Sequence, residues 1–261
     1  MFIKRYGMGP EVCFGIHGWS GDHRTFEPLA RCLPSHISLY AVDLPGCGAS
    51  EPPSEWTLHS VAEELANAIE QLSKPAPVTI VGNCSGALLG LQATALTPNA
   101  VERLVLIDPL AWWPWYFRVF AVPGFGKYAY ATAFANPVGR WIANTGLRSK
   151  RRNDTDLTEG FATVRHDVNL HYLRILREIP TPESFAGITA PINIAFGSHT
   201  FGAVRESAKC WKTIWPQAEL HELDGAGHLP LREAPEAISK IIVEGGACRR
   251  HSQRMSAQTT R

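Results

Sequence analysis

The chain has 261 residues, of which 45% are hydrophobic and 10% aromatic, so it can bury a large core as one domain or as one domain with an insertion. This composition excludes disorder of the whole chain. Its 25 basic and 24 acidic side chains give a formal net charge of +1. That balance gives no reason to expect nucleic acid or another acidic partner, so we expect small or neutral molecules as ligands.

The cysteines and the termini indicate the cellular setting. Six cysteines are scattered without a C-x-x-C pair, so neither a zinc site nor a dense disulfide framework is predicted, and we expect reduced thiols. The amino terminus lacks the apolar run of a signal peptide, and no apolar stretch of about 18 residues occurs. We expect a cytoplasmic protein with no membrane span, no metal and no cofactor. The cysteines are Cys13, Cys32, Cys47, Cys84, Cys210 and Cys248.

Short apolar runs bounded by turn residues predict strands along most of the chain. Most of these runs are continuously apolar, which is typical of strands buried on both faces. Between two of them, TLHSVAEELANAIEQL (57–72) has apolar residues at helical spacing. The pattern therefore predicts a mostly parallel α/β sheet flanked by helices. The strands are expected at EVCFGIH (11–17), ISLYAVD (37–43), PVTIVG (77–82), VERLVLID (101–108), PINIAFG (191–197) and AELHELD (218–224).

The alternation of strands and helices stops after Asp108 and resumes near Ile192. The interval begins with LAWWPWYFRVFAVPGFG, and one explanation of this aromatic cluster is an ordinary helical core. Its place between two strands favours a helical cap over the carboxyl edge of the sheet, at residues 110–186 between core segments 1–109 and 187–244. Its aromatic residues would form an apolar substrate pocket; they are Trp112, Trp113, Trp115, Tyr116 and Phe117.

Two charged stretches are expected outside the packed core. RSKRRNDTD (148–156) predicts a solvated loop, with a site for an acidic ligand as the less favoured alternative. Residues 245–261 are polar and basic without periodicity, which predicts a disordered tail.

Three landmarks follow predicted strands in a fixed order: IHGWSGD (16–22), GNCSG (82–86) and GAGHLP (225–230). Together with DLPGCGAS (43–50) and VERLVLIDP (101–109), they resemble the α/β-hydrolase fold family. The resemblance covers about residues 2–243, from an N-terminal hairpin to the helix APEAISKIIV. It implies a mostly parallel twisted sheet with a helical cap inserted after the family's sixth strand.

The glycine register of GNCSG selects between two adjacent nucleophile candidates. The motif is G-x-S-x-G, and Gly82 and Gly86 place Cys84 at its centre. Ser85 would need glycines at 83 and 87, where Asn and Ala stand. At such an elbow the following helix points its positive end at the thiol, which lowers its pKa. The register therefore predicts Cys84 as the nucleophile.

The resemblance also implies an oxyanion hole made by two backbone N–H groups, those of Ser85 and Trp19. The Trp19 indole is then expected to pack against substrate or cap. His17 precedes this loop and is expected to hydrogen-bond loop backbone beneath the hole.

His228 in GAGHLP occupies the position where the family carries its general base. The family's usual acid is missing, because Thr200 stands in FGSHTFG where an aspartate is expected. Asp108 is the best replacement, since some relatives place the acid after the sixth strand; relatives with the usual acid also carry an aspartate there. Asp224 and Glu222 are weaker candidates because they immediately precede the histidine.

The predicted reaction is hydrolysis of an ester, thioester or lactone through an acyl-cysteine, with a small-molecule acyl group, free or bound to a carrier as a thioester, as substrate. An acyltransferase or cyclase would use the same intermediate with an acceptor other than water. A non-catalytic ligand-binding member of the fold is the remaining alternative, which the missing acid supports. A dehalogenase or epoxide hydrolase would need aspartate at the elbow.

Overall fold

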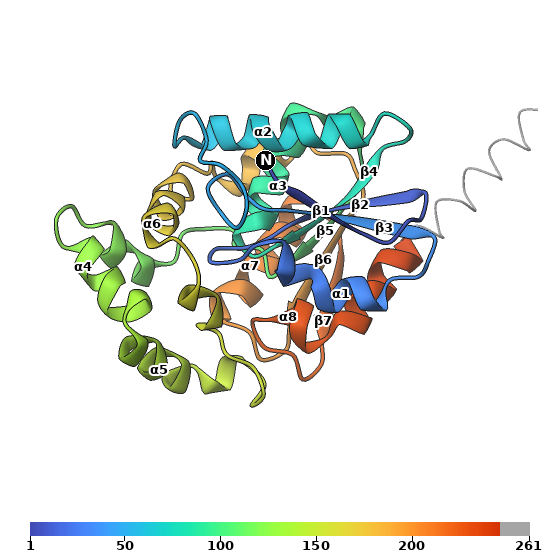
Figure 1. Ribbon diagram of the computed structural model, residues 1–261. Coiled ribbons are helices and arrows are strands. Elements are labelled where there is room, and N and C mark those ends of the chain that lie inside the picture. The colour runs from blue at the N-terminus through green and yellow to red at the C-terminus, as the bar shows by residue number, and fades with distance from the viewer. Residues whose placement is uncertain (246–261) are drawn as a thin grey trace, which may run out of the picture.

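The computed structural model describes residues 1–245, which build one seven-stranded sheet in the order β1-β3-β2-β4-β5-β6-β7 (Figure 1). Among these strands β1 alone is antiparallel to its neighbour, so the predicted mostly parallel sheet is confirmed. The expected N-terminal hairpin is wrong, because β1 pairs with β3 and not with β2. The strands are β1 Ile3–Tyr6, β2 Glu11–Ile16, β3 Ile37–Val42, β4 Val78–Asn83, β5 Val101–Ile107, β6 Ile192–Gly197 and β7 Glu219–Leu223.

All six strands predicted from apolar runs are present. The strand that resembles the family's sixth is the fifth of this chain, β5. The apolar runs are continuous because both faces of the inner strands are covered: in β5, Leu104 and Leu106 belong to one hydrophobic cluster, while Val105 and Ile107 belong to the other. The edge strand β7 is mostly exposed.

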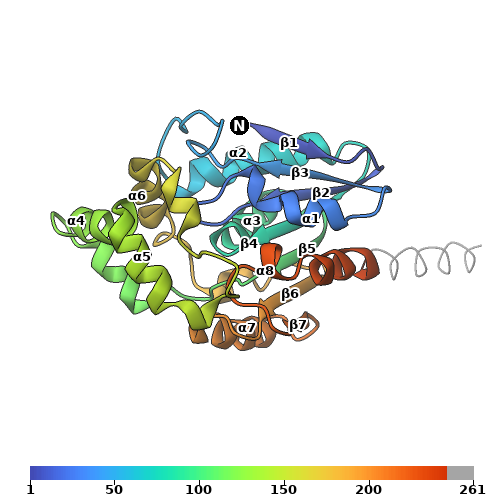
Figure 2. The ribbon, with the colours of Figure 1, turned by 60° about the horizontal axis from the view of Figure 1, so that its bottom comes forward.

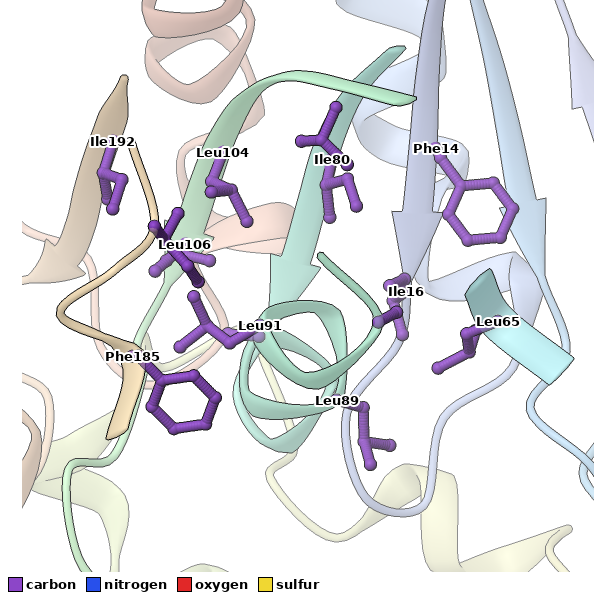
Figure 3. Packing of buried hydrophobic residues seen from close by; sticks show 14 of the residues in the cluster. Phe14, Ile16, Leu65, Ile80, Leu89, Leu91, Leu104, Leu106, Phe185 and Ile192 are labelled. Atoms are coloured by element: carbon purple, nitrogen blue, oxygen red, sulfur yellow. The ribbon is translucent and has the colours of Figure 1, made fainter. Parts of the chain in front are cut away.

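Helices cover both faces of the sheet (Figure 2). One face packs against α2, α3 and α7, and Figure 3 shows Leu91 of α3 beside Leu106 of β5. The other face packs against α1, α8 and a last helix that spans residues 235–245. The helices named here are α1 Glu27–Cys32, α2 Leu58–Leu72, α3 Ser85–Leu96, α7 Gly202–Ile214 and α8 Pro230–Glu233.

The interval between β5 and β6 is helical, and we call residues 109–191 the insert. It has a small hydrophobic cluster of its own, built around Tyr130, Phe161 and Leu173. In Figures 1 and 2, α4 and α5 lie at the end of the molecule farthest from the sheet. Its elements are η3 Trp115–Ala121, α4 Gly126–Tyr130, the π-helical turn η4 Ala131–Ala135, α5 Pro137–Gly146, η5 Arg148–Lys150, η6 Glu159–Ala162, α6 His166–Ile175 and η7 Pro182–Phe185.

The division into a core and a cap at residues 110–186 stays a prediction. Of the predicted tail, only Gly245 belongs to the described residues; residues 246–261, with Cys248, lie outside them. No helix in the described part of the chain is long and apolar enough to cross a membrane.

Candidate active site

Cys84 occupies the turn between β4 and α3. Its backbone has φ 51° and ψ −117°, a conformation that non-glycine residues adopt only where the surrounding structure enforces it. The enforcement comes from close packing of α3 on β2, since a methyl group added to Gly86 would lie 2.3 Å from the carbonyl oxygens of Ile16 and His17. Helix α3 begins at Ser85, as predicted, so its positive end faces the elbow.

Three predicted side chains form one chain of contacts. Cys84 Sγ lies 3.7 Å from Nε2 of His228, and Nδ1 of His228 lies 2.6 Å from Oδ2 of Asp108. Asp108 directly follows β5, while His228 lies in the loop between β7 and α8. Because β4 and β5 are parallel neighbours, Cys84 and Asp108 emerge at the same edge of the sheet. The structure thus brings together a thiol, an imidazole and a carboxylate.

Thr200 belongs to the same network, although from the sequence it marks only a missing acid. Its hydroxyl donates to Oδ2 of Asp108 at 2.6 Å and lies 3.1 Å from Nδ1 of His228. The other Asp108 oxygen accepts from the backbone N–H of Gly197 at 3.2 Å. Asp108 and Thr200 are completely buried, and Asp108 has a left-handed φ of 48°. The carboxylate is therefore fixed by β6 on one side and by His228 on the other.

The two weaker acid candidates lie elsewhere. Glu222 and Asp224 are exposed, and neither contacts His228 among the described residues. The imidazole ring instead meets Phe201, whose ring centroid is 4.8 Å away in an edge arrangement. Asp108 is thus the carboxylate that the fold presents to His228.

The electrostatic environment favours the charged form of His228. Burial alone would lower its pKa, but the hydrogen bonds to Asp108 and Cys84 and the negative charges of both groups raise the pKa to about 10. The imidazole side chain is 19% exposed, whereas the Asp108 carboxylate is fully buried. At neutral pH this environment therefore favours the imidazolium form of His228.

The loop after β2 lies directly against the elbow. A methyl group added to Gly18 would come within 3.1 Å of Cys84 Cβ. The neighbouring His17 is buried and accepts at Nε2 from the backbone N–H of Leu44, so its Nδ1–H donates to Gly18 O at 2.8 Å. Desolvation lowers the pKa of His17, in keeping with this neutral, structural role. The expectation that His17 holds loop backbone is confirmed.

The two proposed oxyanion donors are available in this geometry. Ser85 is the first residue of α3, and the first N–H groups of a helix have no acceptor within it. No backbone acceptor among the described residues engages the N–H of Trp19. Gly18 and Cys84 approach each other closely. Trp19 directly follows Gly18 in the sequence, and Ser85 directly follows Cys84.

The Trp19 indole is expected to pack against either substrate or cap, and it packs against the insert. Its ring contacts four aromatic rings of the insert, and Nε1–H donates to Asn169 O at 3.1 Å. The nearest ring belongs to Phe161, with a centroid distance of 4.8 Å. Through Trp19, the core loop at the elbow joins the hydrophobic cluster of the insert.

The tryptophans of the insert have different environments. Trp113 packs beside Phe117 in the cluster of the insert, whereas Trp112 and Trp115 are 45% and 78% exposed. Burial raises the pKa of the Tyr116 phenol, and the charge of Cys84 raises it further, so Tyr116 lies close to the elbow. The aromatic segment is thus divided between a packed part, an outward part and a part close to Cys84.

The segment RSKRRNDTD is a solvated loop only in part, because it anchors the loop that carries His228. The backbone N–H of His228 donates to Lys150 O at 2.7 Å. One buried carboxylate, that of Glu233, accepts from the backbone N–H groups of Gly227 at 2.5 Å and Arg152 at 2.8 Å, and from Thr155 Oγ1 at 2.6 Å. The bonds from Arg152 and Thr155 join residues 81 and 78 positions apart, and no local pattern in the sequence indicates them.

The other thiols and the acidic cluster near the elbow have structural roles. Burial raises the pKa of both Cys13 and Cys47 to about 12, which keeps these thiols protonated. The one described group with donor spacing suited to a cation is Asp22, His23 and Asp43. Asp43 already accepts from His23 N at 2.6 Å and from His23 Nδ1 at 2.8 Å, so the cluster fastens the loop beside the elbow.

Comparisons with known proteins identify the family and the fold. The model of the alpha/beta hydrolase family matches residues 14–241. A pimeloyl-[acyl-carrier protein] methyl ester esterase of Yersinia pseudotuberculosis is 25% identical over 240 residues, covering 87% of this chain and 90% of that protein. The enzyme of the same name from Methylococcus capsulatus is 34% identical over 107 residues, 41% of this chain and 40% of that protein.

Among solved structures, a lipase-esterase related protein from Clostridium acetobutylicum superimposes with a TM-score of 0.71 at 16% identity, covering 93% of this chain and 98% of that chain. Similarity at this level of identity establishes the fold. The predicted α/β-hydrolase fold is confirmed by the sheet, by this neighbour and by a family model that spans most of the sequence. The chain belongs to the alpha/beta hydrolase family.

Proposed function

We propose that this protein hydrolyses a carboxylic ester, thioester or lactone through an acyl-cysteine on Cys84, with His228 as acid and base and Asp108 as its orienting carboxylate. The observation that supports this most is the unbroken contact from Cys84 Sγ through His228 to Asp108, at 3.7 and 2.6 Å. The coarser expectation, an enzyme that hydrolyses carboxylic esters, is confirmed by the family model and by relatives named as esterases.

The first half of the reaction forms the acyl-enzyme. The Cys84 thiolate attacks the substrate carbonyl carbon, a C–S bond forms, and the carbonyl electrons move onto oxygen. That oxyanion accepts hydrogen bonds from the backbone N–H groups of Trp19 and Ser85. The intermediate then expels the alcohol or thiol, which takes the Nε2 proton of the His228 imidazolium. Acyl-Cys84 and a neutral imidazole remain.

The second half restores the enzyme. Nε2 of His228 accepts a proton from water while the water oxygen attacks the acyl carbon. The C–S bond breaks, the carboxylic acid leaves, and thiolate and imidazolium face each other again. Asp108 keeps Nδ1–H in a hydrogen bond throughout, which fixes the tautomer with a free Nε2.

The nucleophile favours activated acyl donors. An acyl-cysteine is itself a thioester, so its formation from a thioester substrate is nearly balanced, whereas its formation from an unactivated ester or an amide is uphill. The Yersinia relative is named for a methyl ester on an acyl-carrier protein. Carrier-bound acyl groups are accordingly the first substrates to test. The non-catalytic alternative loses its main support, because Asp108 supplies the carboxylate that Thr200 does not.

Intact-protein mass spectrometry after incubation with acyl thioesters and p-nitrophenyl esters tests this proposal. We expect an acyl adduct on the wild type that is absent from Cys84→Ala and unchanged in the control Cys210→Ala, a partly buried thiol outside the site. Release of free acid identifies a hydrolase, and accumulation of an acylated alcohol or amine identifies a transferase. An adduct that persists in Cys84→Ala but disappears in Ser85→Ala contradicts the proposed nucleophile.

A further inference from the structure

The outer surface of the insert exposes large apolar side chains that soluble domains normally bury. Six of them, on η3, α4, α5 and the turn before α4, are between 58% and 78% exposed. We call this set the outer face of the insert. It consists of Trp115, Phe125, Tyr128, Val138, Trp141 and Ile142. Helices α4 and α5 lie at the end of the molecule away from the sheet (Figures 1 and 2).

Helix α5 has the opposite distribution of side chains from an ordinary surface helix. Val138, Trp141 and Ile142 lie at i, i+3 and i+4, on one side, and all three are exposed. The side toward the protein carries polar groups: Arg140 donates to the carbonyls of Phe134 and Ala135, and Asn144 accepts from a backbone N–H. No residue of α5 is buried. A helix whose polar side chains face the protein and whose apolar side chains face outward is suited to contact with an apolar environment outside the protein.

The segment that carries the outer face is basic. Residues 109–153 contain seven basic and no acidic side chains, whereas the other described residues contain 14 basic and 24 acidic ones. Arg152 is the one basic residue of this stretch that pairs with a carboxylate among the described residues. Lys127 lies over the ring of Tyr128, with Nζ 4.9 Å from the centroid. Exposed tryptophan and tyrosine among unpaired cations are typical of surfaces that bind anionic lipid.

We propose that the outer face of the insert docks on the anionic surface of a lipid membrane, with α5 lying in the interface and the exposed cations Arg118 and Lys127 at the headgroups. A second copy of this chain fits less well, because a symmetric contact would place basic side chains against basic side chains. The charge complement of the face is an anionic surface, and a protruding apolar ridge can enter the headgroup region without a shaped partner.

Sedimentation with lipid vesicles tests the docking independently of catalysis. The full chain is mixed with vesicles of phosphatidylcholine alone or of equimolar phosphatidylcholine and phosphatidylglycerol. We expect binding to the mixed vesicles that weakens as salt is added, and the same binding by Cys84→Ala, since no turnover is required. Trp141→Ser combined with Ile142→Ser should weaken binding about tenfold or more. Leu96→Ser, at an exposed apolar position on α3, is the matched control and should bind like the wild type.

A second measurement holds even if the double variant fails to fold. Brominated phosphatidylglycerol should quench tryptophan fluorescence of the wild type, because Trp115 and Trp141 would enter the interface. Three results overturn the proposal: no binding to mixed vesicles at low salt, equal binding by a folded double variant, or quenching no greater than with brominated phosphatidylcholine. Self-association that the double variant abolishes, without vesicle binding, would assign the face to a second copy instead.

Discussion

The carboxyl edge of the sheet and the insert meet at Cys84, and they are built in different ways. At the sheet edge the reacting groups are held by backbone geometry and burial, as the left-handed φ values of Cys84 and Asp108 show. The insert leaves several large apolar side chains exposed, yet it also holds the backbone of His228. Under the proposed mechanism, the chemistry would depend on the sheet edge, while the insert would position the loop of His228. Substitutions at the two regions should therefore differ in size and kind.

Loss of the Asp108 charge should have the largest effect. Asp108→Asn keeps the shape but removes the carboxylate that orients Nδ1–H and stabilises the imidazolium, so we expect turnover to fall roughly 10²- to 10⁴-fold. Steady-state kinetics with an activated thioester measures this loss. Asp224→Asn, at an exposed position near His228, is the matched control and should keep full activity. Comparable activity in both variants would remove Asp108 from the mechanism.

The anchor between the insert and the His228 loop should matter less. Glu233→Gln replaces a carboxylate that accepts from three donors by an amide whose NH₂ faces one of them, which should loosen the loop. We expect kcat to fall about tenfold with KM nearly unchanged, because a shift of the imidazole weakens proton transfer more than binding. Glu236→Gln, exposed on the following helix, controls for charge. A pure loss of stability with wild-type kcat would make Glu233 a structural residue only.

Thr200 provides a finer test of the same network. Thr200→Val keeps the shape and removes the donor to Asp108 Oδ2, so we expect kcat to fall by a few fold, on the order of one lost hydrogen bond. Thr200→Ser keeps the hydroxyl and should recover most of the activity. If valine and serine behave alike, the hydroxyl contributes nothing and only the volume at this position matters.

The pH dependence of stability tests the ion pair of His228 and Asp108 independently of catalysis. The pKa of His228 is raised to about 10 in the folded protein, against about 6.5 in an unfolded chain. Its contribution to the free energy of unfolding is therefore fully present below about pH 6.5 and is lost as the pH rises through 10. Denaturant unfolding of the wild type and Asp108→Asn should show a stability difference that shrinks over this range. A difference that grows with pH would contradict the ion pair.

The residues that could be predicted are those determined by local pattern. The glycine register locates the elbow because Gly82 packs against the backbone of Ala87 and Gly86 packs against the backbone at the end of β2. Continuous apolar runs locate the inner strands because both faces of these strands are covered. The pairing of Asp108 with His228 joins residues 120 positions apart, so the sequence favours Asp108 over the other acids without establishing the contact. The anchor through Lys150 and Glu233 has no local signature at all.

Net charge was the least informative property of the sequence. A value of +1 argues against an acidic partner only if charge is spread evenly, and residues 109–153 contain seven cations and no acid. The aromatic segment predicts a pocket, and in the fold Trp115 is exposed while Tyr116 lies near Cys84. Which of these side chains faces the site depends on the direction in which each points, and periodicity does not fix that direction in a segment of short helices.

The most direct test of the central claim is an NMR titration of the His228 imidazole in the wild type and in Cys84→Ala. If a thiolate on Cys84 and a carboxylate on Asp108 both face this ring, its pKa in the wild type should lie far above 6.5, near 10, and should fall clearly when the thiol is removed. A wild-type value near 6.5, or one that does not change in Cys84→Ala, would contradict the proposed thiolate–imidazolium pair and with it the acyl-cysteine mechanism.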